Sequence, residues 1–175
     1  MSVQILVADD HEVVHQGISL ILQARPEWHI CGRAANGEEA VKMALELKPD
    51  AIIMDVTMPV MNGLEATRKI SKFPDALPVV VFTMHESPGL AESVQAAGGR
   101  GLVLKSRAAQ DLIEALDRVL GGGTYFKSDG RDSEALPNKG PDQGGPLRCQ
   151  LIDLMVSVLH WLSVRPVPSC RSIAT

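Results

Sequence analysis

The sequence predicts a doubly wound α/β fold, in which helices cover both faces of a parallel sheet of five strands. Two observations support this fold class. Short aliphatic runs recur five times between residues 2 and 120, and runs of Val, Ile and Leu are typical of strands buried on both faces. Each run is followed by a segment with the period of an amphipathic helix. Successive strand–helix units of this kind predict a parallel sheet with right-handed crossovers.

Four of the five expected strands consist almost entirely of aliphatic residues. The second contains a histidine and an arginine, so it is expected at an edge of the sheet, where one side meets solvent. In chain order, the strands are expected at residues 3–8, 29–35, 51–54, 79–82 and 101–104.

The helices are indicated by apolar stripes and by capping residues. Apolar or half-apolar residues at helical spacing follow four of the strands: Val14, Ile18 and Leu22; Ala40, Val41 and Ala44; Leu64, Thr67 and Ile70; Leu112, Leu116 and Val119. Asn36 and Glu39 form a capping-box pattern at the second helix. Ser87 and Ser106 are expected to cap the fourth and fifth helices, and Gly98 suits the end of the fourth.

Three regions are predicted along the chain. Residues 1–122 are expected to form the α/β domain. Residues 123–146 are rich in Gly and Pro and are expected to be a linker. Residues 147–175 return to an apolar pattern and are predicted to be a short, irregular tail with room for one helix.

Bulk composition excludes several classes of protein. The net charge is −4, which gives no basic excess of the kind that nucleic-acid binding needs. The three cysteines, at 31, 149 and 170, form no CxxC pair and suit a reducing, cytoplasmic compartment. The N-terminus lacks the basic segment of a signal peptide. The longest near-apolar stretch, residues 151–164, is too short to span a membrane.

Three carboxylates are predicted at one edge of the sheet. Asp9 and Asp10 follow the first strand, and Asp55 follows the third. In the flavodoxin-like strand order 2-1-3-4-5, strands 1 and 3 flank the switch point, where open α/β sheets bind ligands. Like charges repel there unless a cation joins them, and carboxylate oxygens are typical ligands of Mg²⁺. The sequence therefore predicts a divalent-metal site with a phosphate-like partner.

Two more polar residues are expected at the same edge. Thr83 ends the fourth strand and Lys105 follows the fifth. Taken singly, an Asp at a strand end is often only the N-cap of the next helix, and Lys105 is a solvated charge. Taken together, the polar groups that converge on the switch point favour a binding site over capping alone.

These residues resemble a known family. The five positions Asp9, Asp10, Asp55, Thr83 and Lys105, together with the stretch MDVTMPVMNGLEATRKI at residues 54–70, are similar to the receiver domain of bacterial response regulators in two-component phosphorelay signalling. The resemblance covers about residues 2–120 and is closest to the NarL/LuxR subgroup.

The resemblance assigns roles to the carboxylates. Asp55 would be the phospho-acceptor, whose carboxylate attacks the phosphorus of a phosphohistidine on a sensor histidine kinase. Asp10, Asp55 and the backbone carbonyl of Thr57 would bind Mg²⁺ or Mn²⁺, and Asp9 would act through a metal-bound water. The chain would then be a signalling phosphoprotein that catalyses only its own phosphorylation and dephosphorylation, not an enzyme with another substrate.

The resemblance also implies a switch. Thr83 and Lys105 would contact phosphoryl oxygens, and movement of Thr83 would alter the face formed by the fourth helix, fifth strand and fifth helix. A homodimer could form through that face. Leu102 stands where receivers usually carry an aromatic switch residue. Thr57 and His85 border the expected path of the water that removes the phosphoryl group, with simple surface placement as the alternative.

The expected output module is not recognisable. NarL/LuxR regulators continue into a helix-turn-helix domain, and residues 121–175 show no such pattern. DNA binding by this chain is therefore not expected, and the first interpretation is a receiver that signals by protein contact. The alternative is a NarL/LuxR-type transcriptional regulator whose output domain is lost, truncated or degenerate in this chain.

Other interpretations fit the residues less well. A flavodoxin-type cofactor binder would cradle phosphate where Asp9 and Asp10 stand, and a haloacid-dehalogenase phosphatase would need two acids spaced DxD. His11 and His15 lack the partner residues of a transition-metal site, so both are expected to be solvated helix residues. Cys31 is expected to be a packed or edge-strand thiol.

Overall fold

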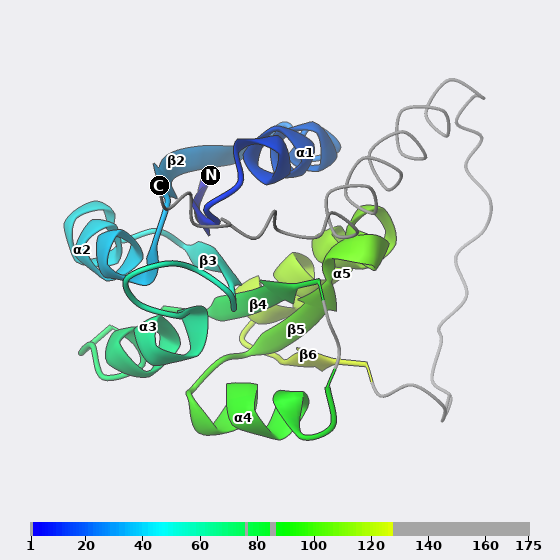
Figure 1. Ribbon diagram of the computed structural model, residues 1–175. Helices are drawn as coiled ribbons and strands as arrows, with labels where there is room; N and C mark the ends of the chain where they lie inside the picture. Colours follow the sequence, from blue (N-terminus) through cyan, green and yellow to red (C-terminus); the bar gives the residue numbers. More distant parts are fainter. Residues whose placement is uncertain (1, 76, 85–86, 128–175) are drawn as a thin grey trace, which may run out of the picture. The chain divides into compact units, whose positions relative to one another are not determined.

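A computed structural model describes residues 2–75, 77–84 and 87–127 (Figure 1). The chain divides into two units between Lys139 and Gly140, and every described residue belongs to the first. The elements in chain order are β1 (Val3–Ala8), α1 (Glu12–Leu22), β2 (Trp28–Ala34), α2 (Gly37–Leu47), β3 (Ala51–Asp55), α3 (Gly63–Ile70), β4 (Val79–Thr83), α4 (Leu90–Ala96), β5 (Gly101–Leu104), the 3₁₀-helix η1 (Lys105–Arg107), α5 (Ala108–Leu120) and β6 (Tyr125–Phe126).

The strands form one parallel sheet in the order β2-β1-β3-β4-β5-β6. The expected order 2-1-3-4-5 is confirmed, with β2 at one edge. The expectation of five strands is wrong, because β6 adds a sixth beside β5, with Gly101 paired to Tyr125 and Leu102 to Phe126. This strand lies in the range for which composition predicts a linker.

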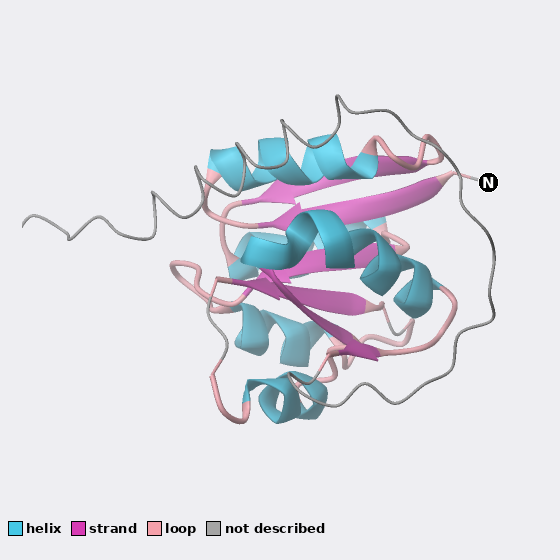
Figure 2. Ribbon diagram, turned by 90° about the vertical axis from the view of Figure 1, so that its right-hand side faces the viewer, coloured by secondary structure: helices cyan, strands magenta, loops and turns pink. Residues whose placement is uncertain are grey.

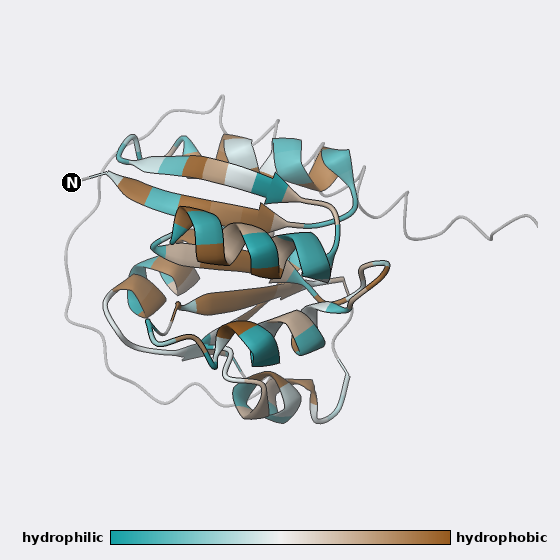
Figure 3. Cartoon of the chain, turned by 90° about the vertical axis from the view of Figure 1, so that its left-hand side faces the viewer, coloured by the Kyte–Doolittle hydropathy of each residue, from teal (hydrophilic) through white to brown (hydrophobic). Residues whose placement is uncertain are grey.

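Helices cover both faces of the sheet. Figures 1 and 2 show α1 and α5 on one face and α2, α3 and α4 on the other. Contacts between α1 and α5, and between α2 and α3, join neighbours within each layer. Figure 3 shows mainly hydrophobic residues along the inner strands, and hydrophobic and polar residues side by side on the helices. No helix in the described ranges combines the length and apolar character that a membrane crossing requires.

Aliphatic side chains and alanines fill the core on the α2 and α3 side. Leu6 and Ala8 of β1 lie there beside Ile52 and Met54 of β3, because alternate residues of a strand face the same side. The helices meet them mainly through small residues: Ala40, Ala44 and Ala66. Small residues let the helix axes approach the sheet closely.

The capping box of α2 is confirmed. The Asn36 side chain accepts a hydrogen bond from the Glu39 backbone N–H at 2.9 Å, and the Glu39 carboxylate accepts one from the Ala35 N–H at 2.9 Å. Asn62 caps α3 in the same way, by accepting from the Glu65 N–H at 2.9 Å. These bonds satisfy N–H groups that have no partner within the helix.

Two expected caps are wrong. The N-cap of α4 is Gly89, with φ of 79°, so the helix begins after the turn that contains Ser87. The N-cap of α5 is Arg107, because Ser106 lies inside the 3₁₀-helix that precedes it. At the other end of α4, Gly98 has φ of 87°, as expected for a glycine that ends a helix.

Candidate functional site

Four strands deliver polar residues to one edge of the sheet. Asp9 and Asp10 follow β1, Asp55 is the last residue of β3, Thr83 is the last residue of β4, and Lys105 follows β5. Because the strands are parallel, all of these positions lie at the carboxyl ends, where ligands bind in open α/β sheets. The structure therefore gathers the predicted site residues at the predicted edge.

A buried lysine joins two of the three carboxylates. The Lys105 Nζ lies 2.5 Å from Asp9 Oδ2 and 3.2 Å from Asp55 Oδ1. The side chains of these residues are only 1–4% exposed. Charge-assisted hydrogen bonds of this length are strong, so Lys105 fixes the distance between the strand ends that carry the two acids.

The charges at the edge do not balance. Burial raises the pKa of the Asp55 carboxyl above its ordinary 3.8; the nearby Lys105 charge opposes this shift, and the Asp9 carboxylate adds to it. With Asp10 included, three carboxylates face one ammonium group, which leaves a formal excess of two negative charges. The site therefore favours a divalent cation.

Asp10 and His11 form the solvent-facing part of the site. Asp10 is 31% exposed, and its Oδ1 lies 2.8 Å from His11 Nδ1. The same nitrogen lies 3.2 Å from Asp9 Oδ1, and the ligand atoms of these three residues all lie within 4.8 Å of one another. His11 is 55% exposed, but its contacts make it part of the site, which sequence reasoning missed.

His15 differs from its prediction. It is 4% exposed rather than solvated, and its Nε2 lies 2.8 Å from the backbone carbonyl oxygen of Asp9. Helical spacing alone places His15 one turn beyond His11, but does not show that α1 turns this position toward the sheet. The buried neighbours Val14 and Ile18 are the signal that could have revealed it.

Thr83 lies on β4, the strand paired with β3 of Asp55, and Leu102 lies on β5, the strand beyond it. Thr83 is 5% exposed, and it pairs in register with Leu104, directly before Lys105. Leu102 is buried in a cluster with Val81, Leu90 and Val94, and Phe126 of β6 packs against that cluster. An aromatic ring thus stands beside Leu102 even though this position is itself aliphatic.

The loop after β3 holds Asp55 by close backbone contacts. The Gly63 N–H donates to the Val56 carbonyl at 2.9 Å, and a Cβ at Gly63 would lie 1.8 Å from the Asp55 carbonyl oxygen. Only glycine fits there, which explains the last residue of the motif MPVMNG. Thr57 is exposed in this loop. His85 lies outside the described residues.

The donors at this edge suit a hard divalent ion. Asp10 and Asp55 offer carboxylate oxygens, the ligands that Mg²⁺ and Mn²⁺ prefer. A cation beside Asp55 would also favour its ionised form, which burial disfavours. The residues therefore fit the metal that the sequence predicts.

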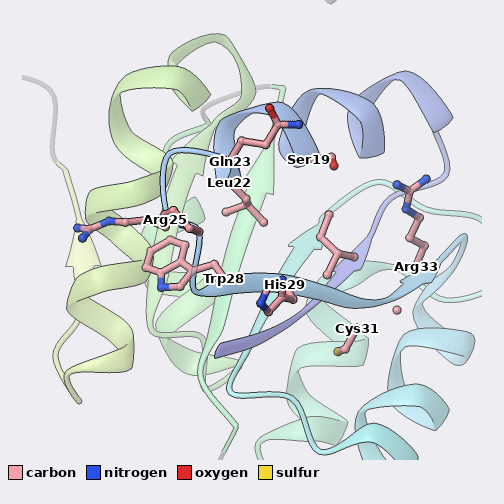
Figure 4. Close-up of a pocket in the computed structure, with 11 residues that line it drawn as sticks. Ser19, Leu22, Gln23, Arg25, Trp28, His29, Cys31 and Arg33 are labelled. Carbon is pink, nitrogen blue, oxygen red and sulfur yellow. The ribbon is translucent and has the colours of Figure 1, made fainter. Parts of the chain in front are cut away.

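A separate open groove lies beside the edge strand β2. Figure 4 shows its lining, which comes from α1 and from β2 with the turn before it, and includes Trp28, His29 and Cys31. Arg25 and Arg33 flank the groove, and they pair with Asp117 and Glu12 respectively. None of the candidate phosphoryl-site residues lines it.

The parallel α/β fold with an acidic cluster at the carboxyl ends of its strands is the arrangement of a known class of signalling domain. The family model of the response regulator receiver domain matches residues 5–117. The chain therefore belongs to the response regulator receiver family.

Curated relatives of this chain are a transcriptional regulatory protein and a response regulator. The chain is 38% identical over 125 residues to the transcriptional regulatory protein DegU of Brevibacillus brevis, covering 71% of this chain and 52% of DegU. It is 35% identical over 141 residues to the response regulator GacA of Pseudomonas aeruginosa, covering 81% of this chain and 66% of GacA. The chain thus spans between half and two thirds of the length of these relatives.

Solved structures agree with this family. A LuxR-family two-component response regulator from Aurantimonas sp. SI85-9A1 matches with a TM-score of 0.69 and 32% identity, covering 74% of this chain and 92% of that one. The response regulator domain of Thermotoga maritima CheB matches with a TM-score of 0.64 and 27% identity, covering 69% and 98%. The predicted family and fold class are confirmed.

Proposed function

We propose that this receiver accepts a phosphoryl group on Asp55 from the phosphohistidine of a sensor histidine kinase, in a reaction that requires Mg²⁺ or Mn²⁺. The contact of Lys105 with both Asp9 and Asp55 carries the proposal. It places a buried cation beside a carboxylate whose own charge is incompletely compensated. Nucleophile and charge stabiliser are therefore held together before any substrate arrives.

Asp55 is the nucleophile of the proposed reaction. One of its carboxylate oxygens forms a bond to phosphorus as the phosphorus–nitrogen bond of the phosphohistidine breaks, and the bonding electrons pass to the imidazole. Lys105 stabilises negative charge on the phosphoryl oxygens, as expected for phosphoryl transfer. Thr83, at the end of the neighbouring strand, donates its hydroxyl to another phosphoryl oxygen.

Three groups would hold the metal: the carboxylates of Asp10 and Asp55 and the backbone carbonyl of Thr57. Asp9 is engaged by Lys105 and by the His11 N–H, so it would act through a metal-bound water. When bound, the ion neutralises charge on the transferred group. Thr57 and His85 are proposed to tune the later loss of the phosphoryl group.

The proposed output is the face formed by α4, β5 and α5. Movement of Thr83 toward Asp55 would disturb the Val81–Leu102 packing beneath α4, and this would change the surface offered to a second copy of the chain. The edge of this face is β6 rather than β5. A homodimer through this surface would therefore include β6.

Phosphorylation by acetyl phosphate tests the proposed function. With Mg²⁺ present, intact-mass spectrometry should show one added phosphoryl group on the wild-type chain and none on Asp55→Asn. Asp75→Asn is the matched control, because Asp75 is 82% exposed and pairs with Lys48 rather than with any residue of the candidate site. This variant should be phosphorylated like wild type. Phosphate on Asp55→Asn would refute the assignment.

A role in transcription control is the second candidate. The relatives DegU, by its name, and the LuxR-family structure from Aurantimonas favour it. If this chain binds DNA itself, the phosphorylated protein should retard a promoter fragment in a gel. The absence of a shift at micromolar protein would leave signalling by protein contact as the function.

A further inference from the structure

His15 occupies an unusual position for a histidine. It lies on the inner side of α1, 4% exposed, between the buried residues Val14 and Ile18. Its Nε2 is 2.8 Å from the Asp9 carbonyl oxygen. A carbonyl can only accept a hydrogen bond, so Nε2 carries the proton and donates.

The Asp9 carbonyl stands where the sheet ladder stops. The Asp9 N–H still donates to the Ala34 carbonyl of β2 at 3.0 Å, but β1 ends at Ala8 and its last pair with β3 is Ala8 with Met54. Beyond that point, the His15 imidazole rather than a strand donates a hydrogen bond to the Asp9 carbonyl. It thereby holds the peptide plane between Asp9 and Asp10.

The other polar atoms of Asp9 are held as well. Its Oδ1 accepts from the His11 N–H at 2.9 Å, and its Oδ2 accepts from Lys105. The bond from His15 differs from these because it acts directly on the carbonyl of the peptide that joins Asp9 to Asp10. The direction in which the Asp10 carboxylate leaves the chain therefore depends on this bond.

A histidine is a poor choice for packing alone. Its Nδ1 is buried and has no hydrogen-bond partner among the described residues, and a buried polar atom without a partner is destabilising. A leucine would fill similar space between Val14 and Ile18 without this defect. The bond to Asp9 is the gain that offsets it.

We propose that His15 is a positioning residue for the metal site: through the Asp9 carbonyl it orients Asp10 for binding of the divalent cation. The inference rests on the proposed function, in which Asp10 is a metal ligand. Residues that orient metal ligands without touching the metal typically change affinity by about 10- to 100-fold when replaced.

Two substitutions separate positioning from packing. His15→Leu removes the donor and keeps an apolar side chain of similar size, whereas His15→Gln keeps an N–H donor at the same distance from Cβ. Calorimetric titration with Mg²⁺ should show a dissociation constant raised about tenfold in His15→Leu and close to wild type in His15→Gln. His29→Leu, on the exposed surface of β2, is the matched control and should bind Mg²⁺ normally.

The kinetics give a second readout. In phosphorylation by acetyl phosphate, His15→Leu should need more Mg²⁺ for half-maximal rate but reach the wild-type rate at saturation. Urea unfolding shows whether each variant is folded, and His15→Met replaces His15→Leu if the latter is not. Equal Mg²⁺ affinity in wild type and the folded apolar variant would overturn the proposal.

The two hypotheses fail separately. If wild type binds Mg²⁺ but never acquires phosphate on Asp55, the proposed function is wrong, while the calorimetric comparison still decides the role of His15. If wild type is phosphorylated and both His15 variants bind Mg²⁺ like wild type, only the positioning inference is wrong.

Discussion

Asp55 is a carboxylate that the fold buries although burial disfavours its charge. Its pKa is raised above 3.8, chiefly by desolvation. A group whose pKa is raised by folding stabilises the native state below its unfolded pKa, and that contribution is lost as the pH rises through the folded pKa. The buried negative charge that Asp55 acquires as the pH rises through its folded pKa therefore lowers the stability of the domain.

Asp55→Asn should accordingly stabilise the protein at neutral pH. The free energy of unfolding is expected to rise by about 1 kcal/mol, within the usual range for stabilising substitutions. The gain should grow as the pH rises above 3.8, because only wild type acquires the buried charge. Urea unfolding across that range measures it, with Asp75→Asn as an exposed control; a loss of stability at neutral pH would contradict the argument.

Val60, in the loop after β3, has a strained backbone conformation. It is β-branched, 80% exposed, and has φ of 65°, a conformation that disfavours residues with a branched Cβ. Val60→Gly should therefore raise the free energy of unfolding by about 1 kcal/mol, since the strain relieved exceeds the entropy that glycine adds to the unfolded chain. Thermal unfolding checks this. Val60→Ile, which keeps the branch, should give no such gain.

At the scale of elements, β6 is the strand that sequence composition did not predict. GGGTYFK has the glycine content of a linker, and a strand of two residues leaves no period to detect. The structure shows what the sequence pattern could not: Tyr125 is 1% exposed, its N–H donates to the Arg100 carbonyl at 2.8 Å, and Arg118 lies over its ring. The pairing depends on contacts between distant segments, so local propensity could not predict it.

Tyr125→Ala tests the contribution of β6 to the domain. Loss of a fully buried aromatic side chain should lower the free energy of unfolding by about 3 kcal/mol. The amide of Tyr125 should also lose protection from hydrogen exchange, because β6 would detach from β5. Leu20→Ala, at a position 53% exposed in α1, should change stability by less than about 0.5 kcal/mol. Equal effects of the two substitutions would show that β6 contributes little.

The helix ends illustrate the same limit. Asn36 and Glu39 cap α2 as predicted, because a capping box is a purely local arrangement. Ser87 and Ser106 are equally suitable by type, but tertiary packing starts α4 and α5 further along, after a left-handed Gly89 and a 3₁₀ turn. Residue type shows which residues can cap a helix, and packing decides which of them do so.

At the scale of the whole molecule, the site could be predicted because the topology is simple. Aliphatic runs that end in Asp9, Asp55, Thr83 and Lys105 fix four positions at one edge once the strands are parallel. The contacts could not be predicted: the lysine between Asp9 and Asp55, and the buried His15 behind them, depend on side-chain geometry. The roles assigned to these residues remain predictions.

Metal binding should be visible in the stability of the entire domain. A ligand that binds only the native state adds about 2.7 kcal/mol to the free energy of unfolding at 100 times its dissociation constant. Mg²⁺ should therefore raise the melting temperature of wild type in a concentration-dependent way. Asp10→Asn should abolish the increase, and Asp75→Asn should retain it. An equal increase in Asp10→Asn would exclude Asp10 as a ligand.

The direction of β6 determines at which edge of the sheet the described part of the chain ends. Helices in a parallel sheet run back against the strands, so α5 ends at the edge opposite Asp55. β6 is parallel to β5, so it directs the chain back toward the edge that carries Asp55. Lys127, the residue after β6, has its Nζ 2.9 Å from Asp111 Oδ1 in the first turn of α5. Asp111 also pairs with Arg107, two residues after Lys105. Two ion pairs therefore connect Lys127, the last described residue, to the turn that carries Lys105, so a shift of Lys105 would reach the end of β6 over a short distance.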